Sequence, residues 1–419
     1  MIALLLLATF QAPLEPDTLT LAMSEAVHRA LAASPSIASA ASDVTRTRGL
    51  RAETLFPFPS NPVAVYGRTT RTTPSTTTQD TDWLVSQEIE IGGQSFTRRA
   101  AMSAFLRASE ARVEDAQRLT ALEARQAYLA LALAHRQEAL IDTTAGFAER
   151  MAGFAKRQFE AGEINRLELN AAVLDAARTR SAAERARAVT ETAAADLARL
   201  LSVPADTVVR TGPLPPLPRV AWDSAARDPI SLARSRRPDL LAVEADVEGA
   251  GKALSAAQRA FIPNLTVAAV GGQESGTDDL LGLQFGLQVP LFYNGQAARG
   301  AAEADLAASR AARAATTREI QAELQGGLAR LRRSTAAERH FAGAVVASAA
   351  ENVALTERAL VEGEVDLTDV IVLRRAALEA QLEYLAVLAD AYSAWFEVSA
   401  ALDVDPLELA PLLTGKPEP

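Results

Sequence analysis

Two short acidic turns carry the residues with the clearest chemical potential in this sequence. Residues 158–169 read QFEAGEINRLEL, and residues 359–370 read ALVEGEVDLTDV. Each segment places a glycine directly before a glutamate, and further acids follow within six residues of that glycine. Carboxylates that follow a turn can cap the next helix. Repeated around a symmetric assembly, the same acids can form a negative ring that favours cations over anions.

Both interpretations of the acids stay open at this stage. Asn165 and Asp366 stand where a helix would start after each turn, which suits a capping role. The candidate ring residues come from both turns: Glu163, Glu168, Glu364, Asp366 and Asp369. Gly162 and Gly363 would permit the turns, because glycine adopts left-handed backbone conformations without a steric penalty.

The rest of the sequence offers little catalytic chemistry. His28, His135 and His340 are far apart, and no nucleophile, zinc-binding or phosphate-binding motif accompanies them. We therefore expect no enzymatic activity, no cofactor and no metal site. A net charge of −10 argues against a nucleic-acid partner, which favours a basic surface. The sequence contains no cysteine, which excludes disulfides and thiolate ligands.

The acidic turns belong to a larger internal duplication. ALAASPSIASAASDV (30–44) parallels LARSRRPDLLAVEADV (232–247), so that Pro35 aligns with Pro238. PSNPVAVYG (59–67) parallels PNLTVAAVGG (263–272), and IEIGGQ (89–94) parallels VPLFYNGQ (289–296). Four landmarks in the same order, including the turns, indicate a duplicated unit.

Each copy reads as helix, two strands, long helix, turn and helix. The first helices are expected at about 20–55 and 229–260, and the long helices at about 95–160 and 296–361. At 1.5 Å per residue, each long helix would extend roughly 100 Å. The expected segments are a signal peptide (1–16), a first repeat (17–202), a proline-rich connector packed outside the main body (203–228), a second repeat (229–405) and a C-terminal tail (406–419). Within the repeats we expect β-hairpins at about 62–91 and 264–291 and tip turns at 161–168 and 362–369.

The strands show a clear period of two. In residues 280–292, LLGLQFGLQVPLF, large apolar residues alternate with glycine and glutamine, and residues 83–93 follow a similar pattern. Strands of about ten residues with one apolar face are typical of transmembrane β-barrels. On the polar faces, Glu88, Glu90, Gln284 and Gln288 would face water inside the barrel. Four strands cannot close a barrel alone, so this interpretation requires several chains.

The order and spacing of these features resemble the TolC family of outer-membrane efflux channels. The turns at 162–169 and 363–370 are similar to the periplasmic tip turns of that family. SQEIEIGGQSFTRR (86–99) and GLQVPLFYNGQAARG (286–300) are similar to its strand-to-helix junctions, especially those of heavy-metal efflux members. Val372 departs from the pattern, because some relatives carry a further acid there.

The resemblance implies a mainly α fold with a small β part. A homotrimer would close a twelve-stranded transmembrane β-barrel, continued by a long α-helical barrel through the periplasm. It also implies an outer-membrane location in lipid, a periplasmic adaptor and an inner-membrane pump of the resistance–nodulation–division class. The adaptor would meet the apolar tip residues and the turn glycines: Gly162, Ile164, Leu167, Gly363, Val365 and Leu367.

The expected function is the exit duct of a tripartite efflux system that passively conducts metal cations or drugs. Two alternatives remain open. A type I secretion duct would use the same fold to pass polypeptides. A soluble coiled-coil scaffold belongs to another class, and the apolar alternation of residues 281–289 counts against it.

Overall fold

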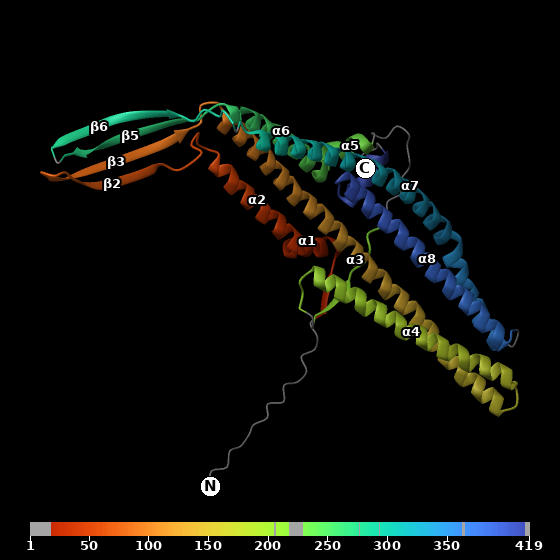
Figure 1. The fold of residues 1–419 in the computed structure, drawn as a ribbon. Coiled ribbons are helices and arrows are strands. Elements are labelled where there is room, and N and C mark those ends of the chain that lie inside the picture. The colour runs from red at the N-terminus through yellow and green to blue at the C-terminus, as the bar shows by residue number, and fades with distance from the viewer. Residues whose placement is uncertain are drawn as a thin grey trace, which may run out of the picture. The chain divides into compact units, whose positions relative to one another are not determined.

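The computed structural model describes residues 18–204, 207–217, 229–275, 277–292, 294–362 and 365–414. The expected signal peptide, residues 1–16, lies outside this range, as do Gly363, Glu364 and residues 218–228 of the connector. The described chain is mainly helical with a small β part, which confirms the expected fold class (Figure 1).

The order of helices and strands from α1 to α4 recurs from α5 to α8. In the first half they are β1 (Thr18–Leu21), α1 (Met23–Ala33), α2 (Pro35–Glu53), β2 (Val63–Thr72), β3 (Thr77–Ile89), α3 (Gln94–Glu160), α4 (Arg166–Leu200) and β4 (Val208–Thr211). In the second half they are α5 (Pro229–Arg236), α6 (Pro238–Gln258), the 3-10 turn η1 (Arg259–Phe261), β5 (Leu265–Glu274), β6 (Asp278–Leu287), α7 (Gln296–Glu362), α8 (Leu367–Leu402) and α9 (Pro406–Thr414).

The aligned prolines interrupt a helix in each half. Ser34, between α1 and α2, has ψ of 121°, and Arg237, between α5 and α6, has ψ of 118°. Proline disfavours the helical region for the residue before it, yet it fits the first position of the next helix. The continuous helices expected at 20–55 and 229–260 are therefore each two helices.

The described residues fall into two compact units. The sheet unit comprises residues 36–116 and 234–321, and the helical unit comprises the other described residues. Both 67-residue helices, α3 and α7, contribute to each unit.

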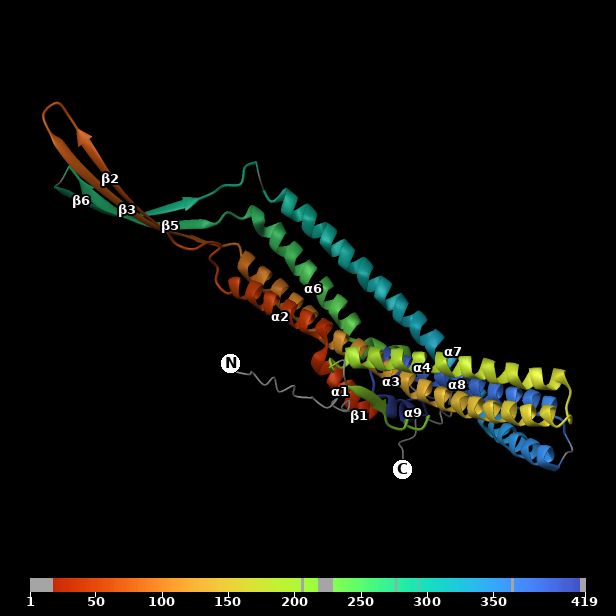
Figure 2. The same cartoon turned by 90° about the horizontal axis from the view of Figure 1, so that it is seen from below.

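The sheet unit is organised by one antiparallel four-stranded sheet in the order β2-β3-β5-β6, which is visible in Figures 1 and 2. Consecutive pairs form hairpins, and β3 pairs with β5 to join the two repeats. The outer edges of β2 and β6 have no neighbouring strand within the described chain. The expected hairpins at 62–91 and 264–291 enclose these strands.

The helical unit has a core in which α1, α3 and α4 contribute both large apolar residues and alanines. Tyr128, Leu131 and Leu197 are fully buried there, together with alanines that allow close helix packing. The core also includes a two-stranded parallel sheet in which β1 pairs with β4. Its Val209 is 2% exposed. Part of the connector that we expected outside the main body is therefore buried in it.

Helix α8 and the C-terminal segment are also part of the helical unit. By length and composition α8 is the one helix of the described chain that could cross a membrane, but 61% of its most apolar window is buried. Trp395 donates a hydrogen bond from Nε1 to the carbonyl oxygen of Pro406 at 2.9 Å, and Leu409 of α9 is fully buried. The described part of the expected tail is thus an ordered helix packed on α8.

Candidate functional site

The strand register gathers large apolar side chains on one face of the sheet. Directly opposed residues point to the same side, and Tyr66 opposes Trp83, which opposes Gly271. Gly271 in turn opposes Leu281. In the next row of this face, Val85 opposes Ala269, which opposes Leu283. The exposed members of this apolar face are Tyr66, Trp83, Val85, Leu281, Leu283, Phe285 and Leu287. Their exposed fractions lie between 38% and 83%, so no other element of the described residues covers this face.

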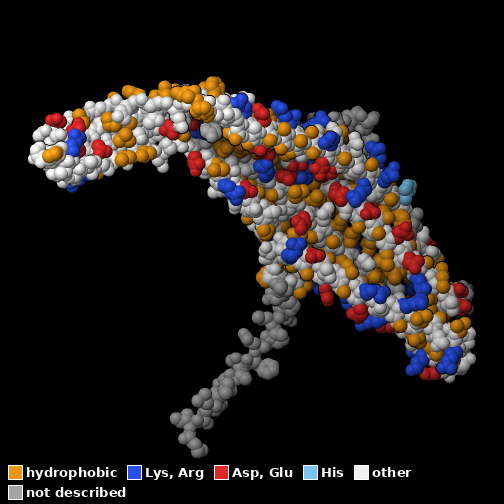
Figure 3. Space-filling view, viewed as in Figure 1, with side chains coloured by type: hydrophobic (Ala, Val, Ile, Leu, Met, Phe, Trp, Pro, Cys, Tyr) orange, Lys and Arg blue, Asp and Glu red, His pale blue; other side chains and the backbone are white. Residues whose placement is uncertain are grey.

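The opposite face, which we call the polar face, carries smaller and more polar side chains. Ser86, Ala268 and Gln284 share one row across the strands, and Glu88, Thr266 and Gly286 share the next. Val65, Leu84 and Val270 are on the same side toward the hairpin ends. Figure 3 shows charged side chains concentrated at the hairpin ends, whereas apolar ones follow an edge of the sheet.

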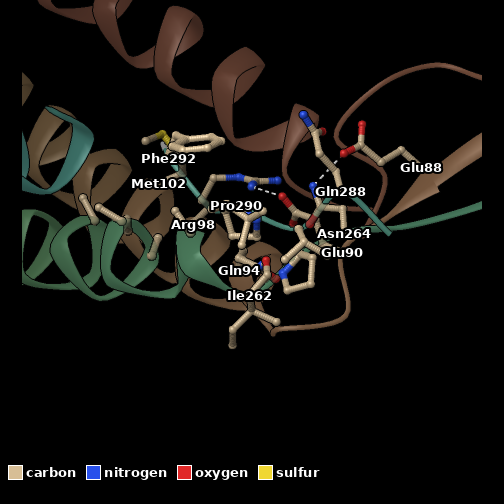
Figure 4. A pocket seen from close by; sticks show the side chains of 18 residues that line it. Glu88, Glu90, Gln94, Arg98, Met102, Ile262, Asn264, Gln288, Pro290 and Phe292 are labelled. Carbon is tan, nitrogen blue, oxygen red and sulfur yellow. Dashed lines mark hydrogen bonds and ion pairs between the residues drawn. The ribbon is translucent and has the colours of Figure 1, made fainter. Parts of the chain in front are cut away.

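The four predicted lumen residues are not equivalent in the structure. Glu88 and Gln284 lie on the polar face, and Gln288 follows the end of β6 and is exposed. Glu90 differs, because its side chain is only 4% exposed and forms an ion pair with Arg98 (Figure 4). Arg98 lies one turn into α3, which starts at Gln94. Its side chain is therefore still close to the end of the strand. The expectation that Glu90 faces open water is corrected accordingly.

Further polar residues collect at this strand-to-helix junction. Asn264 donates from Nδ2 to Oε1 of Glu88 at 2.8 Å, and Gln94 donates from Nε2 to the carbonyl oxygen of Ile262 at 3.0 Å. Arg98 and Asn264 were not selected from the sequence, although both lie in or beside the aligned motifs. Their role depends on contacts between residues far apart in the chain, which no local pattern reveals.

The first tip turn is built around Gly162, as expected from the glycine. Its φ is +77°, in the left-handed region that glycine adopts without a steric penalty. The amide of Glu163 donates to the carbonyl oxygen of Gln158 at 2.9 Å, and that of Gly162 donates to Phe159 at 3.0 Å. These two bonds end α3 in a Schellman motif.

Both tips then begin a capped helix. Asn165 accepts hydrogen bonds at Oδ1 from the amides of Leu167 and Glu168, and the Glu168 carboxylate accepts from Asn165 in return. In the second tip, Asp366 accepts from the amide of Asp369 at 2.8 Å. Glu168 and Asp366 therefore have the capping role, because their carboxylates accept hydrogen bonds at the start of a helix. Glu163 and Asp369 are exposed.

The two tips pack on one another through an apolar cluster of the helical unit. Leu367 is 6% exposed and forms the cluster with Ala155 and Ala172, and Ile164 packs against it. We expected Leu367 to be exposed for contact with the adaptor, but it is buried because the first turn of α8 lies against α3 and α4. Leu167 is 77% exposed, and Val365 is partly buried.

Arginines of α8 add charge to the tip region. The guanidinium carbon of Arg374 lies 3.4 Å from the centroid of the Phe147 ring, in cation–π geometry. Burial lowers the pKa of Arg374, and the positive charge of Arg150 lowers it further. Arg375 pairs with Asp175 of α4 at 2.8 Å. No local sequence pattern marks these arginines, because their partners Phe147 and Asp175 lie in other helices.

The described chain therefore combines a sheet that has one exposed apolar face with helical hairpins that have capped tips. Known proteins share this fold. Residues 230–403 match the family described as outer membrane efflux protein. Proteins of this family are transport ducts and not enzymes. No curated protein matches the chain.

Solved structures extend the likeness over both repeats. A membrane protein from Pseudomonas aeruginosa is 21% identical with a TM-score of 0.77, over 91% of this chain and 93% of that one. The Campylobacter jejuni CmeC outer membrane channel is 16% identical with a TM-score of 0.78, over 94% and 90%. The outer membrane protein VceC of Vibrio cholerae is 18% identical with a TM-score of 0.74, over 91% and 95%. At these identities the matches concern the fold.

Proposed function

We propose that the chain is the outer-membrane exit duct of a tripartite efflux system and passively conducts small solutes, either metal cations or drugs. The observation that carries the proposal is the four-stranded sheet, because one of its faces carries large exposed apolar side chains whereas the other carries smaller and more polar ones. Exposed apolar side chains at this density suit lipid, which gives them a favourable environment.

The open edges of the sheet support a trimer. An unpaired strand edge in lipid leaves backbone amide and carbonyl groups without partners, which a bilayer does not tolerate. Pairing β6 of one chain with β2 of the next removes these edges, and three chains would then make a twelve-stranded barrel. The α3–α4 and α7–α8 hairpins would continue it as a helical barrel in the periplasm.

The tips would meet a periplasmic adaptor, which links the duct to an inner-membrane pump of the resistance–nodulation–division class. Gly162 and Gly363 would shape the turns, and Leu167, Ile164 and Val365 would supply apolar contacts. The burial of Leu367 assigns it to packing between the tips. Glu163, Glu364, Asp366 and Asp369 would polarise the entrance, with Glu168 held in its helix cap.

Membrane fractionation and crosslinked pull-down test this proposal. The duct should require detergent for extraction, form a crosslinked trimer and bring down an adaptor and a pump. A chain that stays soluble without detergent would be a scaffold and would refute the proposal. Recovery of a polypeptide-exporting pump would assign the duct to type I secretion.

A further inference from the structure

A cavity of about 660 Å³ lies in the sheet unit at the junction of β3 and α3 (Figure 4). Its polar part is formed by Glu88, Glu90, Gln94, Arg98, Asn264 and Gln288. Its apolar part comes from alanines of α6, from Met102 of α3 and from Phe292 after β6. The volume lies within the range of roughly 300–1,000 Å³ that is usual for small-molecule sites.

Two buried acceptor oxygens of the cavity have no hydrogen-bond partner among the described residues: Oε2 of Glu90 and Oε1 of Gln94. Glu90 is 8% exposed and Gln94 is 6% exposed. The orientation of the Gln94 amide is defined, because its Nε2 donates to the carbonyl oxygens of Ile262 and Arg259. A buried acceptor without a donor is unfavourable, so a molecule that brings donors would be stabilised here.

The corresponding glutamine of the second repeat, Gln296, is bonded differently. At the aligned position, Gln296 donates from Nε2 to the carbonyl oxygen of Phe292 at 3.1 Å. Its Oε1 accepts from the amide of Asn294 at 3.0 Å. Both ends of Gln296 are thus used locally, whereas the acceptor end of Gln94 is left toward the cavity. The unpaired Gln94 oxygen therefore has no counterpart at Gln296.

The charges at the cavity indicate what kind of donor fits. Glu88 and Glu90 bring two carboxylates, whereas Arg98 brings one guanidinium, which already pairs with one oxygen of Glu90. The polar part therefore has an excess of one negative charge. An ammonium group offers three donors and one positive charge, and the alanine, methionine and phenylalanine lining suits an apolar remainder.

We propose that this junction cavity binds an amphiphilic organic monocation of the alkylammonium class. Glu88 belongs both to the cavity and to the polar face of the sheet, so the ligand would arrive by the aqueous path of the duct. The inference rests on the proposed function and narrows it, because it names a class of solute that the duct would bind during export.

Equilibrium dialysis of radiolabelled n-hexylammonium against the full-length protein in lipid nanodiscs tests the proposal, with empty nanodiscs as the partition control. The wild type should bind it saturably, and uncharged 1-hexanol should bind at least about tenfold more weakly. Glu90→Gln should weaken binding about tenfold, because one charge-assisted contact is lost. Glu88→Gln should weaken it in the same direction while leaving the Glu90–Arg98 pair intact.

Asp82→Asn is the matched control for the loss of one negative charge. Asp82 shares the polar face with Glu88 but does not line the cavity, so its variant should bind hexylammonium as the wild type does. Binding no greater than that of empty nanodiscs would overturn the proposal, as would equal affinities of the wild type, Glu88→Gln and Glu90→Gln. Because Glu88→Gln spares the ion pair, the test survives if Glu90→Gln does not fold.

Planar-bilayer recordings of the same wild-type preparation separate the two proposals. A conducting protein that does not bind hexylammonium overturns the cavity assignment and leaves the duct in place. A protein without conductance overturns the duct, and saturable binding sensitive to Glu88 and Glu90 would still establish the cavity as a monocation site.

Discussion

Replacing Leu283 with arginine tests whether the apolar face of the sheet lies in lipid. Leu283 is in the middle of β6, is 70% exposed and opposes Ala269 of β5. An arginine on the lipid face of a barrel costs about 2–4 kcal/mol near the bilayer midplane. A trimer carries the change three times, so the assembly would lose roughly 6–12 kcal/mol. In water the same surface change would alter stability by no more than about 0.5 kcal/mol.

The adjacent residue provides the control. Gln284 is also exposed, opposes Ala268 and lies on the polar face, so Gln284→Arg introduces the same charge at the same depth toward the proposed lumen. The assay is folding of the purified chain into lipid vesicles, read as the yield of protease-resistant trimer and its urea midpoint. Leu283→Arg should lose most of the trimer, and Gln284→Arg should retain it. Equal yields for the two variants would refute the assignment of the faces.

Two further predictions concern the tips. Gly162→Val should weaken adaptor binding while the trimer persists, because a β-branched residue at φ of +77° costs about 1–2 kcal/mol, although its Cβ would meet no atom within 4 Å. Ala161→Val is the control. Unchanged adaptor affinity of Gly162→Val in a pull-down titration would contradict the tip assignment. The double variant Asp366→Asn, Asp369→Asn should show a lower cation preference in single-channel recordings. The tip should stay folded, because asparagine also caps helices. An unaltered reversal potential would refute the role of both acids in cation selectivity.

Much of the fold follows from local patterns in the sequence. The alternation of large apolar residues with glycine and glutamine in residues 280–288 predicts a strand with two unlike faces, and β6 has them. The glycine of residues 158–169 predicts a left-handed turn, and Gly162 adopts it. These features are predictable because a strand period or a positive φ is imposed by neighbouring residues alone.

The candidate site was less predictable. The parity of residues 83–93 placed Glu90 on the same side as Glu88, but the pattern ends where the strand ends, and the fold then turns Glu90 toward Arg98. Leu367 looked like a free apolar residue in a tip turn, yet it is buried because α8 begins there and packs on α3 and α4. In each case the environment of a side chain depends on an element that the local sequence does not contain.

Local sequence patterns are enough to predict the duplicated order of elements, the two faces of each strand and the glycine turn with its following cap. All of these depend on backbone preferences and on periodicity over a few residues. Only the folded chain shows which acids are exposed and which are paired. It also pairs β1 with β4 in a small sheet whose Leu21 and Val209 are buried, and it brings acceptor oxygens of Glu90 and Gln94 to one cavity. Burial and hydrogen bonding of these residues depend on contacts between segments many residues apart. Neither segment alone contains the information that defines such a contact.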